Sequence, residues 1–119
     1  MIGIDLVKTA RIKGMIERHG DRALSRFLGR DEIALIKRPE TAAGFWAAKE
    51  ACAKALGCGI GAECGFHDIV IGKSEKGAPR LALSPAVRER FGITDASLSI
   101  THDGDYAIAV VALEGPKTL

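Results

Sequence analysis

The sequence is poor in aromatic residues and in proline, and it contains no long hydrophobic run. Aromatic residues make up 5% of its 119 positions and proline occurs four times, so no segment reads as a linker or a low-complexity tract. The longest unbroken apolar run, residues 106–113, is far shorter than the ~20 residues of a membrane-spanning helix. Asp5 interrupts any segment that would resemble a signal peptide. We therefore expect a soluble, cytoplasmic protein without membrane contacts, forming a single domain over residues 1–119.

Cysteine is also scarce, and its spacing is not that of a disulfide or zinc framework. The three cysteines (Cys52, Cys58 and Cys64) are an odd number and form no Cys-x-x-Cys pair, so we expect reduced thiols. A zinc site made of Cys58, Cys64 and His67 would lack a fourth ligand and a standard spacing. No structural zinc is expected.

Net charge is only +2, but the basic residues are concentrated near the N-terminus. Residues 8–26 contain six basic and two acidic side chains, a net charge of +4, which leaves −2 for the remainder. Apolar residues at helical spacing before Gly20 predict an amphipathic helix with an outward basic face. That face is either a solvated helix surface or a docking surface for an acidic partner. Nucleic acid is not expected as a partner, because the basic residues are not interleaved with aromatic ones.

Periodicity and turn residues predict helices in the first half of the chain and strands in the second. A strand over 1–7 precedes a helix that ends at Gly20, two short helices capped by Asp21 and Asp31, and a long helix from Thr41 to Gly57. Strands are predicted over 66–71, 80–83, 97–102 and 106–113, with a helix that starts at Ser84-Pro85 and ends at Gly92. This order is typical of an α+β domain, with the N-terminal helices packed on a mostly antiparallel sheet.

The long helix carries an acid and a lysine on the side opposite its apolar stripe. Glu50 and Lys54 are one turn apart, and the stripe consists of Phe45, Ala48, Cys52 and Leu56. Alanines at 47, 51, 53 and 55 allow other backbones to come close. Glu50 and Lys54 are therefore expected in a crevice, where a metal–phosphate site could form.

Asp5, Glu50 and His102 each have a structural and a functional interpretation. Asp5 lies in an apolar strand and needs a partner, such as a basic side chain, backbone amides or a cation. Taken singly, Glu50 could be a surface acid paired with Lys54, and His102 a hydrogen-bonding residue at a turn. Their joint occurrence in specific local contexts favours a functional role.

Several short motifs occur in order along nearly the whole chain: Gly3-Ile4-Asp5-Leu6-Val7 with Arg11-Ile12, Phe27 and Glu32, Ala47-Ala48-Lys49-Glu50-Ala51 with Lys54-Ala55-Leu56-Gly57, Phe66-His67-Asp68-Ile69, Gly77-Ala78-Pro79, and Ser99-Ile100-Thr101-His102-Asp103. As an ordered set they closely resemble the holo-acyl-carrier-protein synthase family, the small stand-alone 4′-phosphopantetheinyl transferases. The resemblance implies transfer of the 4′-phosphopantetheine group from coenzyme A to a serine of apo acyl carrier protein. Adenosine 3′,5′-bisphosphate is the expected second product.

The resemblance also implies roles for individual residues. Asp5 and Glu50 would bind Mg²⁺, and they would be catalytic together with Lys54 and His102. The serine proton would pass to a water on the metal or to Glu50, with His102 as the second choice. The expected coenzyme A contacts are Lys49, Lys54, Gly57, Gly59, Thr101 and His102.

The resemblance further implies a protein partner and an oligomer. Arg11 would contact the acidic carrier protein, so the docking interpretation of the basic helix is preferred, with Arg18 and Arg22 as further contacts. The expected assembly is a homotrimer with active sites between subunits. Asp5 and Glu50 would come from one chain and His102 from its neighbour.

Two departures from the family pattern and two alternative functions stay open at this point. Members of the family commonly have arginine where this chain has Phe45, and threonine where it has Cys58. Lys49 or Lys54 could compensate for the missing arginine, or Trp46 could stack on adenine. The alternatives to a transferase are a magnesium-dependent pyrophosphate hydrolase and a non-catalytic module that binds an acidic partner.

Overall fold

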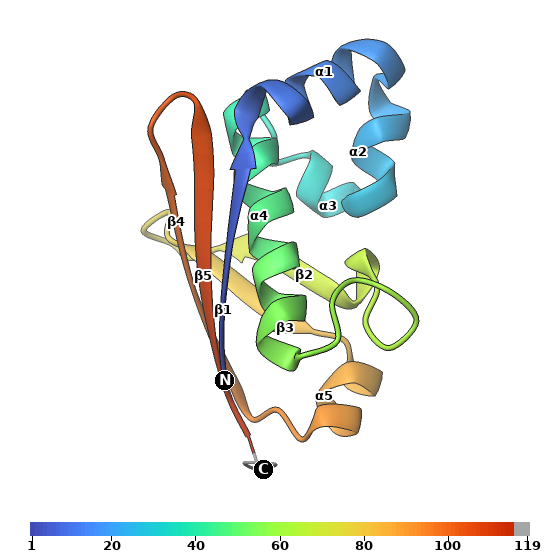
Figure 1. Ribbon diagram of the computed structural model, residues 1–119, viewed down its shortest axis with the longest axis vertical. Coiled ribbons are helices and arrows are strands. Elements are labelled where there is room, and N and C mark those ends of the chain that lie inside the picture. Colours follow the sequence, from blue (N-terminus) through green and yellow to red (C-terminus); the bar gives the residue numbers. More distant parts are fainter. Residues whose placement is uncertain (116–119) are drawn as a thin grey trace.

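A long helix packed on a three-stranded antiparallel sheet organises the molecule (Figure 1). The computed structural model describes residues 1–115. The helix is α4 (Pro39–Leu56), and the sheet has the order β1 (Ile2–Lys8), β5 (Tyr106–Glu114), β4 (Asp95–His102). The first strand of the chain thus pairs with the last one, at the edge of the sheet. The register places Asp5 opposite Ala109 and His102 opposite Ala107 on the central strand.

The other elements lie at the two ends of α4 and beside it (Figure 1). Three helices, α1 (Thr9–His19), α2 (Asp21–Phe27) and α3 (Arg30–Ile33), gather near its N-terminal half. A 3₁₀ turn, η1 (Phe66–Asp68), leads into a separate antiparallel pair, β2 (Ile69–Lys73) and β3 (Pro79–Leu83), followed by α5 (Pro85–Phe91). The predicted α+β class with antiparallel strands is confirmed, but the strands form two sheets.

Three local predictions were wrong. The long helix begins at Pro39, not at Thr41, because proline needs no hydrogen-bond partner for its nitrogen in the first turn. Asp21 and Asp31 do not cap their helices, since Gly20 and Gly29 occupy the capping positions of α2 and α3. Residues 66–68 form a 3₁₀ turn, so the strand starts only at Ile69.

Helix α4 is buried on almost every side. Between Ala42 and Leu56 only Trp46, Glu50 and Lys54 are not buried, and these three are spaced four residues apart. Residues at this spacing lie on one face of a helix. They form the single open stripe of α4, which we call the 46–50–54 stripe.

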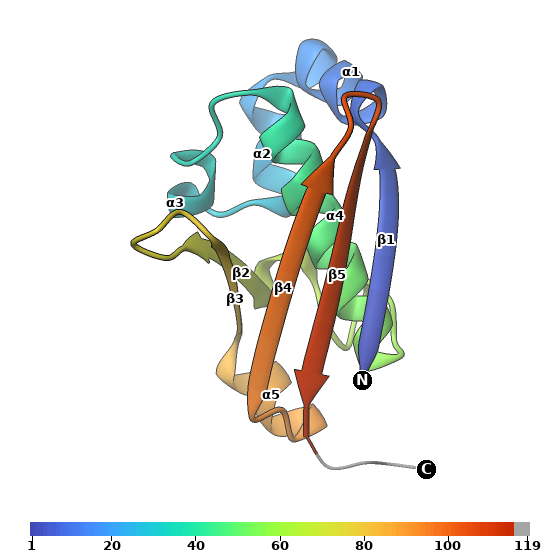
Figure 2. The same ribbon diagram turned by 90° about the vertical axis from the view of Figure 1, so that its left-hand side faces the viewer.

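The sheet has one covered and one open face. Gly3, Asp5 and Val7 of β1 point towards α4, whereas Ile2, Ile4 and Leu6 point away from it and are 74%, 59% and 56% exposed. Figure 2 looks onto this open face, and no helix drawn there covers β1, β5 or β4. No helix within residues 1–115 combines the length and apolar character needed to cross a membrane.

Candidate functional site

Gly3 brings the first strand into contact with the backbone of α4. A Cβ atom at position 3 would overlap the carbonyl oxygen of Ala51 and lie 2.7 Å from the nitrogen of Ala55. Only glycine allows this approach. Side chains two residues apart share a face of a strand, so Asp5 points towards α4 as Gly3 does. There it meets the segment of the helix that carries Lys54.

Asp5 finds its partner on α4. The Lys54 ammonium donates to Asp5 Oδ1 at 2.9 Å and to the backbone carbonyl of Ile4 at 3.2 Å. The Asp5 side chain is 14% exposed and that of Lys54 is 53% exposed. The sequence-based alternative, a pair between Glu50 and Lys54 along the helix, is replaced by a pair between the helix and β1.

Glu50 lies in the electrostatic field of Asp5. Partial burial raises the pKa of Glu50, the Asp5 carboxylate raises it further, and Lys54 and Arg11 oppose the shift. The carboxylates of Asp5 and Glu50 are therefore close enough to interact, and the Lys54 ammonium contacts Asp5. That the two acids bind one ion together stays a prediction.

The donor set of this place fits Mg²⁺ better than zinc. No group of three or more His, Cys, Asp or Glu side chains within residues 1–115 could enclose a metal ion. Magnesium does not need such a group, since it keeps several waters and uses one or two carboxylates when phosphates supply further oxygens. Asp5 and Glu50 are residues that could hold it.

His102 lies in a different place, at the end of β4 over the N-terminal half of α4. A Cβ atom on Gly44 would stand 3.0 Å from His102 Cε1 and 3.0 Å from Ile100 Cγ2. The imidazole borders a pocket of about 230 Å³ between α4, β4 and the β2–β3 turn. Its lining consists of Arg38, Thr41, Gly44, Phe45, Lys73, Gly77, Pro79, Ile100 and His102. We call it the His102 pocket.

The His102 pocket and the carboxylate pair face opposite sides of α4. Thr41, which lines the pocket, and Glu50 are nine residues apart, and at ~100° per residue this places them about half a turn from each other around the axis. The buried body of the helix stands between them. One chain alone therefore does not bring His102 to Asp5 and Glu50.

Two cations in the His102 pocket were not predicted from the sequence. Arg38 and Lys73 are both exposed and line it together with Phe45, the position where arginine was expected. Neither belongs to a motif, and Lys73 reaches the pocket only because the β2–β3 turn folds back towards α4. No signal in the sequence identifies them.

Lys49 is a correction to the predicted coenzyme A contacts. Its ammonium is fully buried and donates to the Phe27 carbonyl at 2.7 Å, to Glu32 Oε1 at 2.8 Å and to the Phe66 carbonyl at 3.0 Å. All three of its N–H donors are thereby used. Lys49 is a structural residue, and it does not compensate for the missing arginine.

Trp46 also does not stack beside the His102 pocket. Its ring packs against Phe27, with centroids 5.1 Å apart, and against Phe66 at 4.9 Å. The guanidinium carbon of Arg11 lies 5.1 Å from the Trp46 ring centroid. The indole belongs to the side of α4 that carries Glu50.

The remaining predicted contacts are scattered. Gly57 ends α4 with a φ of 81°, and Gly59 has a φ of 67°, so both need glycine for backbone reasons. Thr101 is exposed on the open face of the sheet, opposite to His102 on the same strand. Arg18 and Arg22 are exposed on α1 and α2.

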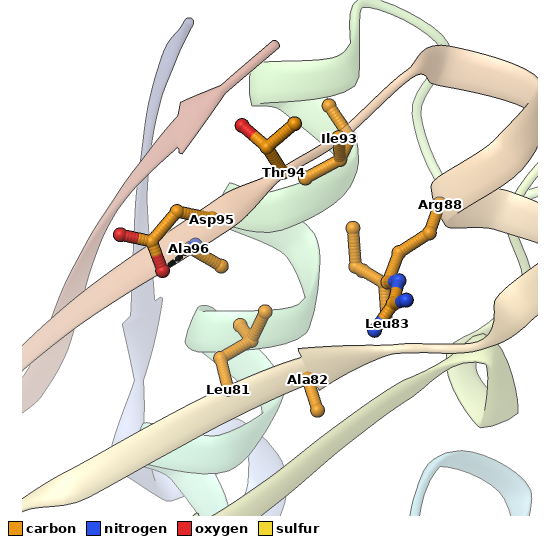
Figure 3. Close-up of a pocket in the computed structure, with 8 residues that line it drawn as sticks. All are labelled: Leu81, Ala82, Leu83, Arg88, Ile93, Thr94, Asp95 and Ala96. Carbon is orange, nitrogen blue, oxygen red and sulfur yellow. Dashed lines mark hydrogen bonds between the residues drawn. The ribbon is translucent and has the colours of Figure 1, made fainter.

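A further cavity lies away from all of these residues. It measures about 150 Å³ and is bordered by β3, α5 and β4 (Figure 3). Leu81, Leu83 and Ile93 supply apolar walls, and Asp95 accepts a hydrogen bond from the Ala96 backbone at 2.9 Å. None of the predicted site residues lines it.

Comparison with known proteins gives consistent matches over most of the chain. Residues 1–111 match the model of the 4′-phosphopantetheinyl transferase superfamily. Holo-[acyl-carrier-protein] synthase of Wolinella succinogenes is 64% identical, with 96% of this chain and 97% of that protein covered. The corresponding protein of Sulfurimonas denitrificans is 60% identical, with 96% and 94% covered.

Solved structures agree with this result. The Helicobacter pylori holo-[acyl-carrier-protein] synthase in complex with coenzyme A matches with a TM-score of 0.93 at 48% identity, over 96% of this chain and 100% of that chain. The Bacillus anthracis enzyme in complex with coenzyme A (3′,5′-ADP) matches with a TM-score of 0.81 at 36% identity, over 97% and 96%.

Proposed function

This chain belongs to the holo-[acyl-carrier-protein] synthase family of 4′-phosphopantetheinyl transferases, and we propose the residues by which it moves phosphopantetheine from coenzyme A to acyl carrier protein. Asp5 and Glu50 hold Mg²⁺, Lys54 binds a phosphate, and the His102 pocket takes the nucleotide end of coenzyme A. The observation that carries this assignment is the convergence of Asp5, Glu50 and Lys54 from two distant segments.

The convergence of the three side chains supports phosphoryl transfer. When bound by Asp5 and Glu50, Mg²⁺ would neutralise negative charge on the pyrophosphate oxygens during the transfer. Lys54 is half-exposed while its ammonium contacts Asp5, so it has open surface on which to bind a phosphate oxygen as well. In this way the stripe residues Glu50 and Lys54 would align the diphosphate along α4.

Glu50 is also suited to accept the proton of the attacking serine. The serine oxygen bonds to the β-phosphorus of coenzyme A, and the bond from that phosphorus to the bridging oxygen breaks. Adenosine 3′,5′-bisphosphate leaves with the bridging oxygen, and the serine proton passes to Glu50. Partial burial and Asp5 raise the pKa of Glu50 only while the site holds no metal, and Mg²⁺ would favour the charged form again. Glu50 would therefore accept the proton on a carboxylate oxygen that the metal does not use.

The His102 pocket has the chemistry of a nucleotide site. Phe45, Pro79 and Ile100 offer apolar surface, and Arg38, Lys73 and His102 offer donors for phosphate. Arg38 and Lys73 would supply the positive charge for which the family commonly has an arginine at position 45. Thr101 is not part of this pocket.

Association of identical chains would bring the His102 pocket of one chain to the Asp5–Glu50 pair of another. Because His102 and Glu50 face opposite sides of α4, a complete site needs His102 from a second chain. The open face of the sheet supports this, because Ile2, Ile4, Leu6 and Val110 leave exposed apolar surface without a cover (Figure 2). We propose a homotrimer that buries this face, with each site built from Asp5 and Glu50 of one chain and His102 of the next.

The carrier protein would dock on the basic first helix. Arg11 and Arg18 are exposed on α1 and Arg22 is exposed at the start of α2, and acyl carrier proteins are acidic, so complementary charge favours this surface. We also propose that the enzyme works in the cytoplasm, together with these two substrates.

Mass spectrometry of apo acyl carrier protein tests the proposal. After incubation with this protein, coenzyme A and Mg²⁺, the carrier should gain the mass of one phosphopantetheine group, and omission of either coenzyme A or Mg²⁺ should abolish the gain. A parallel reaction without carrier protein measures release of adenosine 3′,5′-bisphosphate. Release without carrier would indicate the hydrolase alternative and contradict the transferase.

A further inference from the structure

We propose that Trp46 is a positioning residue for Arg11: the indole holds the Arg11 guanidinium next to Glu50, so that an acidic partner bound by Arg11 arrives directly beside the carboxylate pair. The inference rests on the proposed function, because the acidic partner is the carrier protein. It adds to that function a residue on α4 that sets where the carrier docks.

The contact between Arg11 and Trp46 has the geometry of a cation–π interaction. The guanidinium carbon of Arg11 lies 5.1 Å from the centroid of the indole. Cations within about 6 Å of an aromatic face are attracted by its quadrupole, and tryptophan is the strongest of the aromatic partners. Arg11 itself is exposed on α1, so its long side chain would be mobile without this platform.

The indole is in turn held by an aromatic cluster of Phe27, Trp46 and Phe66. Phe27 is completely buried and meets the indole edge-on at 5.1 Å, and Phe66 lies 4.9 Å from it at an interplanar angle of 43°. The backbone carbonyls of both phenylalanines accept hydrogen bonds from the buried Lys49 ammonium. The indole is therefore held in place by the fully buried Phe27 and Lys49 and by the half-buried Phe66.

The position of Trp46 on the helix determines what the guanidinium reaches. Trp46 and Glu50 are neighbours on the 46–50–54 stripe, one turn apart. A guanidinium stacked on the indole thus lies on the side of α4 that carries Glu50. Arg11 of α1 and Glu50 of α4 thus face the same side of the molecule. A carrier protein bound to Arg11 would bring its serine towards the phosphates held at Glu50.

Kinetics of paired variants test the inference. Trp46→Leu removes the π face, Trp46→Phe keeps one, and Arg11→Ala removes the cation. We expect Trp46→Leu to raise KM for apo carrier protein about two- to fivefold with KM for coenzyme A unchanged, and Trp46→Phe to have a smaller effect. In the Arg11→Ala background, Trp46→Leu should cause no further rise. An equal rise in both backgrounds would contradict the inference, since Trp46 would then act independently of Arg11.

Tryptophan fluorescence provides a readout apart from turnover. Trp46 is the single tryptophan of the sequence, so its emission reports on the stacked guanidinium directly. Titration with a tryptophan-free apo carrier protein should change the emission of the wild type but not that of Arg11→Ala. Arg90→Ala is the control and should respond like the wild type, since Arg90 belongs to α5 at the other end of the molecule (Figure 1). If the carrier protein changed the emission of Arg11→Ala as much as that of the wild type, the inference would be overturned.

The two proposals fail in different ways. If the wild type transfers no phosphopantetheine, the proposed function is wrong. If it does, and Trp46→Leu and Trp46→Phe both have the wild-type KM for carrier protein, only the positioning role is wrong. Trp46→Phe and the fluorescence titration remain informative even where the leucine variant does not fold.

Discussion

Gly3 of β1 lies against the carbonyl of Ala51 in α4 so closely that no side chain fits between them. Backbone thus packs on backbone where the first strand crosses the long helix. This contact determines how near Asp5 comes to Glu50 and Lys54.

Replacing Gly3 with alanine should therefore loosen both the fold and the site. We expect Gly3→Ala to lower the free energy of unfolding by about 1–3 kcal/mol, because the methyl group meets rigid backbone and the strand must shift. The Mg²⁺ concentration for half-maximal activity should rise as Asp5 moves away. Gly72→Ala, on β2, is the matched control, since a Cβ there meets no atom within 4 Å. Urea denaturation and a magnesium titration of both variants measure the two effects.

Replacing each of the two acid-paired lysines of α4 with methionine should affect a different property: stability for Lys49 and activity for Lys54. Lys49→Met leaves the Glu32 carboxylate buried without its cation, and we expect a loss of about 3–5 kcal/mol of stability. Lys54→Met removes a half-exposed pair and should cost no more than about 1 kcal/mol, yet it should abolish most activity. Denaturant unfolding and turnover assays separate these outcomes. Comparable stability losses in the two variants would contradict the assignment of Lys49 as structural.

Gly44→Ala should impair coenzyme A binding without loss of stability. The new methyl group would stand 3.0 Å from His102 Cε1 and displace the imidazole. Alanine favours the helix by about 1 kcal/mol over glycine, which offsets the crowding. KM for coenzyme A should rise several-fold while KM for carrier protein stays constant. Gly72→Ala on β2, where an added Cβ meets no atom within 4 Å, is the control and should leave both constants unchanged.

A charge on the open face of the sheet should separate the subunits. Ile4→Glu places a carboxylate in the apolar surface proposed as the trimer interface, where Ile4 is 59% exposed. Val70→Glu is the control: Val70 is 50% exposed but lies on the other sheet. Light scattering should give a smaller molar mass for Ile4→Glu than for the wild type, with loss of activity, and no change for Val70→Glu. A wild-type protein that is monomeric and fully active would refute the shared site.

Asp68 should contribute stability that disappears in acid. The Gly65 N–H and the Ser84 hydroxyl both donate to its carboxylate, and these hydrogen bonds lower the pKa of Asp68. A folded-state pKa below the unfolded value stabilises the fold above the unfolded pKa, and this contribution is lost as pH falls through the folded pKa. Asp68→Asn should accordingly be less stable than the wild type near pH ~7, with the gap narrowing below about pH 4. Urea unfolding across this range, with the exposed Asp21→Asn as control, measures the gap.

Much of the secondary structure could be predicted from local signals, and the errors have local causes. Gly57 and Gly92 end their helices at the predicted residues, since both adopt left-handed φ values. Ser84 caps α5 by accepting from the Val87 N–H. Pro39 was misread because proline both interrupts and begins helices, and the 3₁₀ turn at 66–68 has no periodicity long enough to distinguish it from a strand.

For the site, the residue types could be predicted but most of the pairings could not. Asp5 needed a partner on general grounds, but the only pairing that the sequence offered for Lys54 was the structural alternative with Glu50, its neighbour on the helix. The strand crossing at Gly3 puts Asp5 nearer to Lys54. Lys49 and Glu50 are adjacent in sequence, and only the packing of α4 turns one into the core and the other towards solvent.

By itself the sequence determined most of the helices and strands and the acids Asp5 and Glu50 on which the proposed chemistry depends. These properties follow from residue type and spacing. Tertiary structure decided that Lys49 is buried with Glu32, that Arg11 rests on Trp46, and that His102 and Glu50 lie on opposite sides of α4. Contacts between segments far apart in the chain depend on how α4 is oriented against the sheet and the N-terminal helices, and no local pattern encodes that orientation.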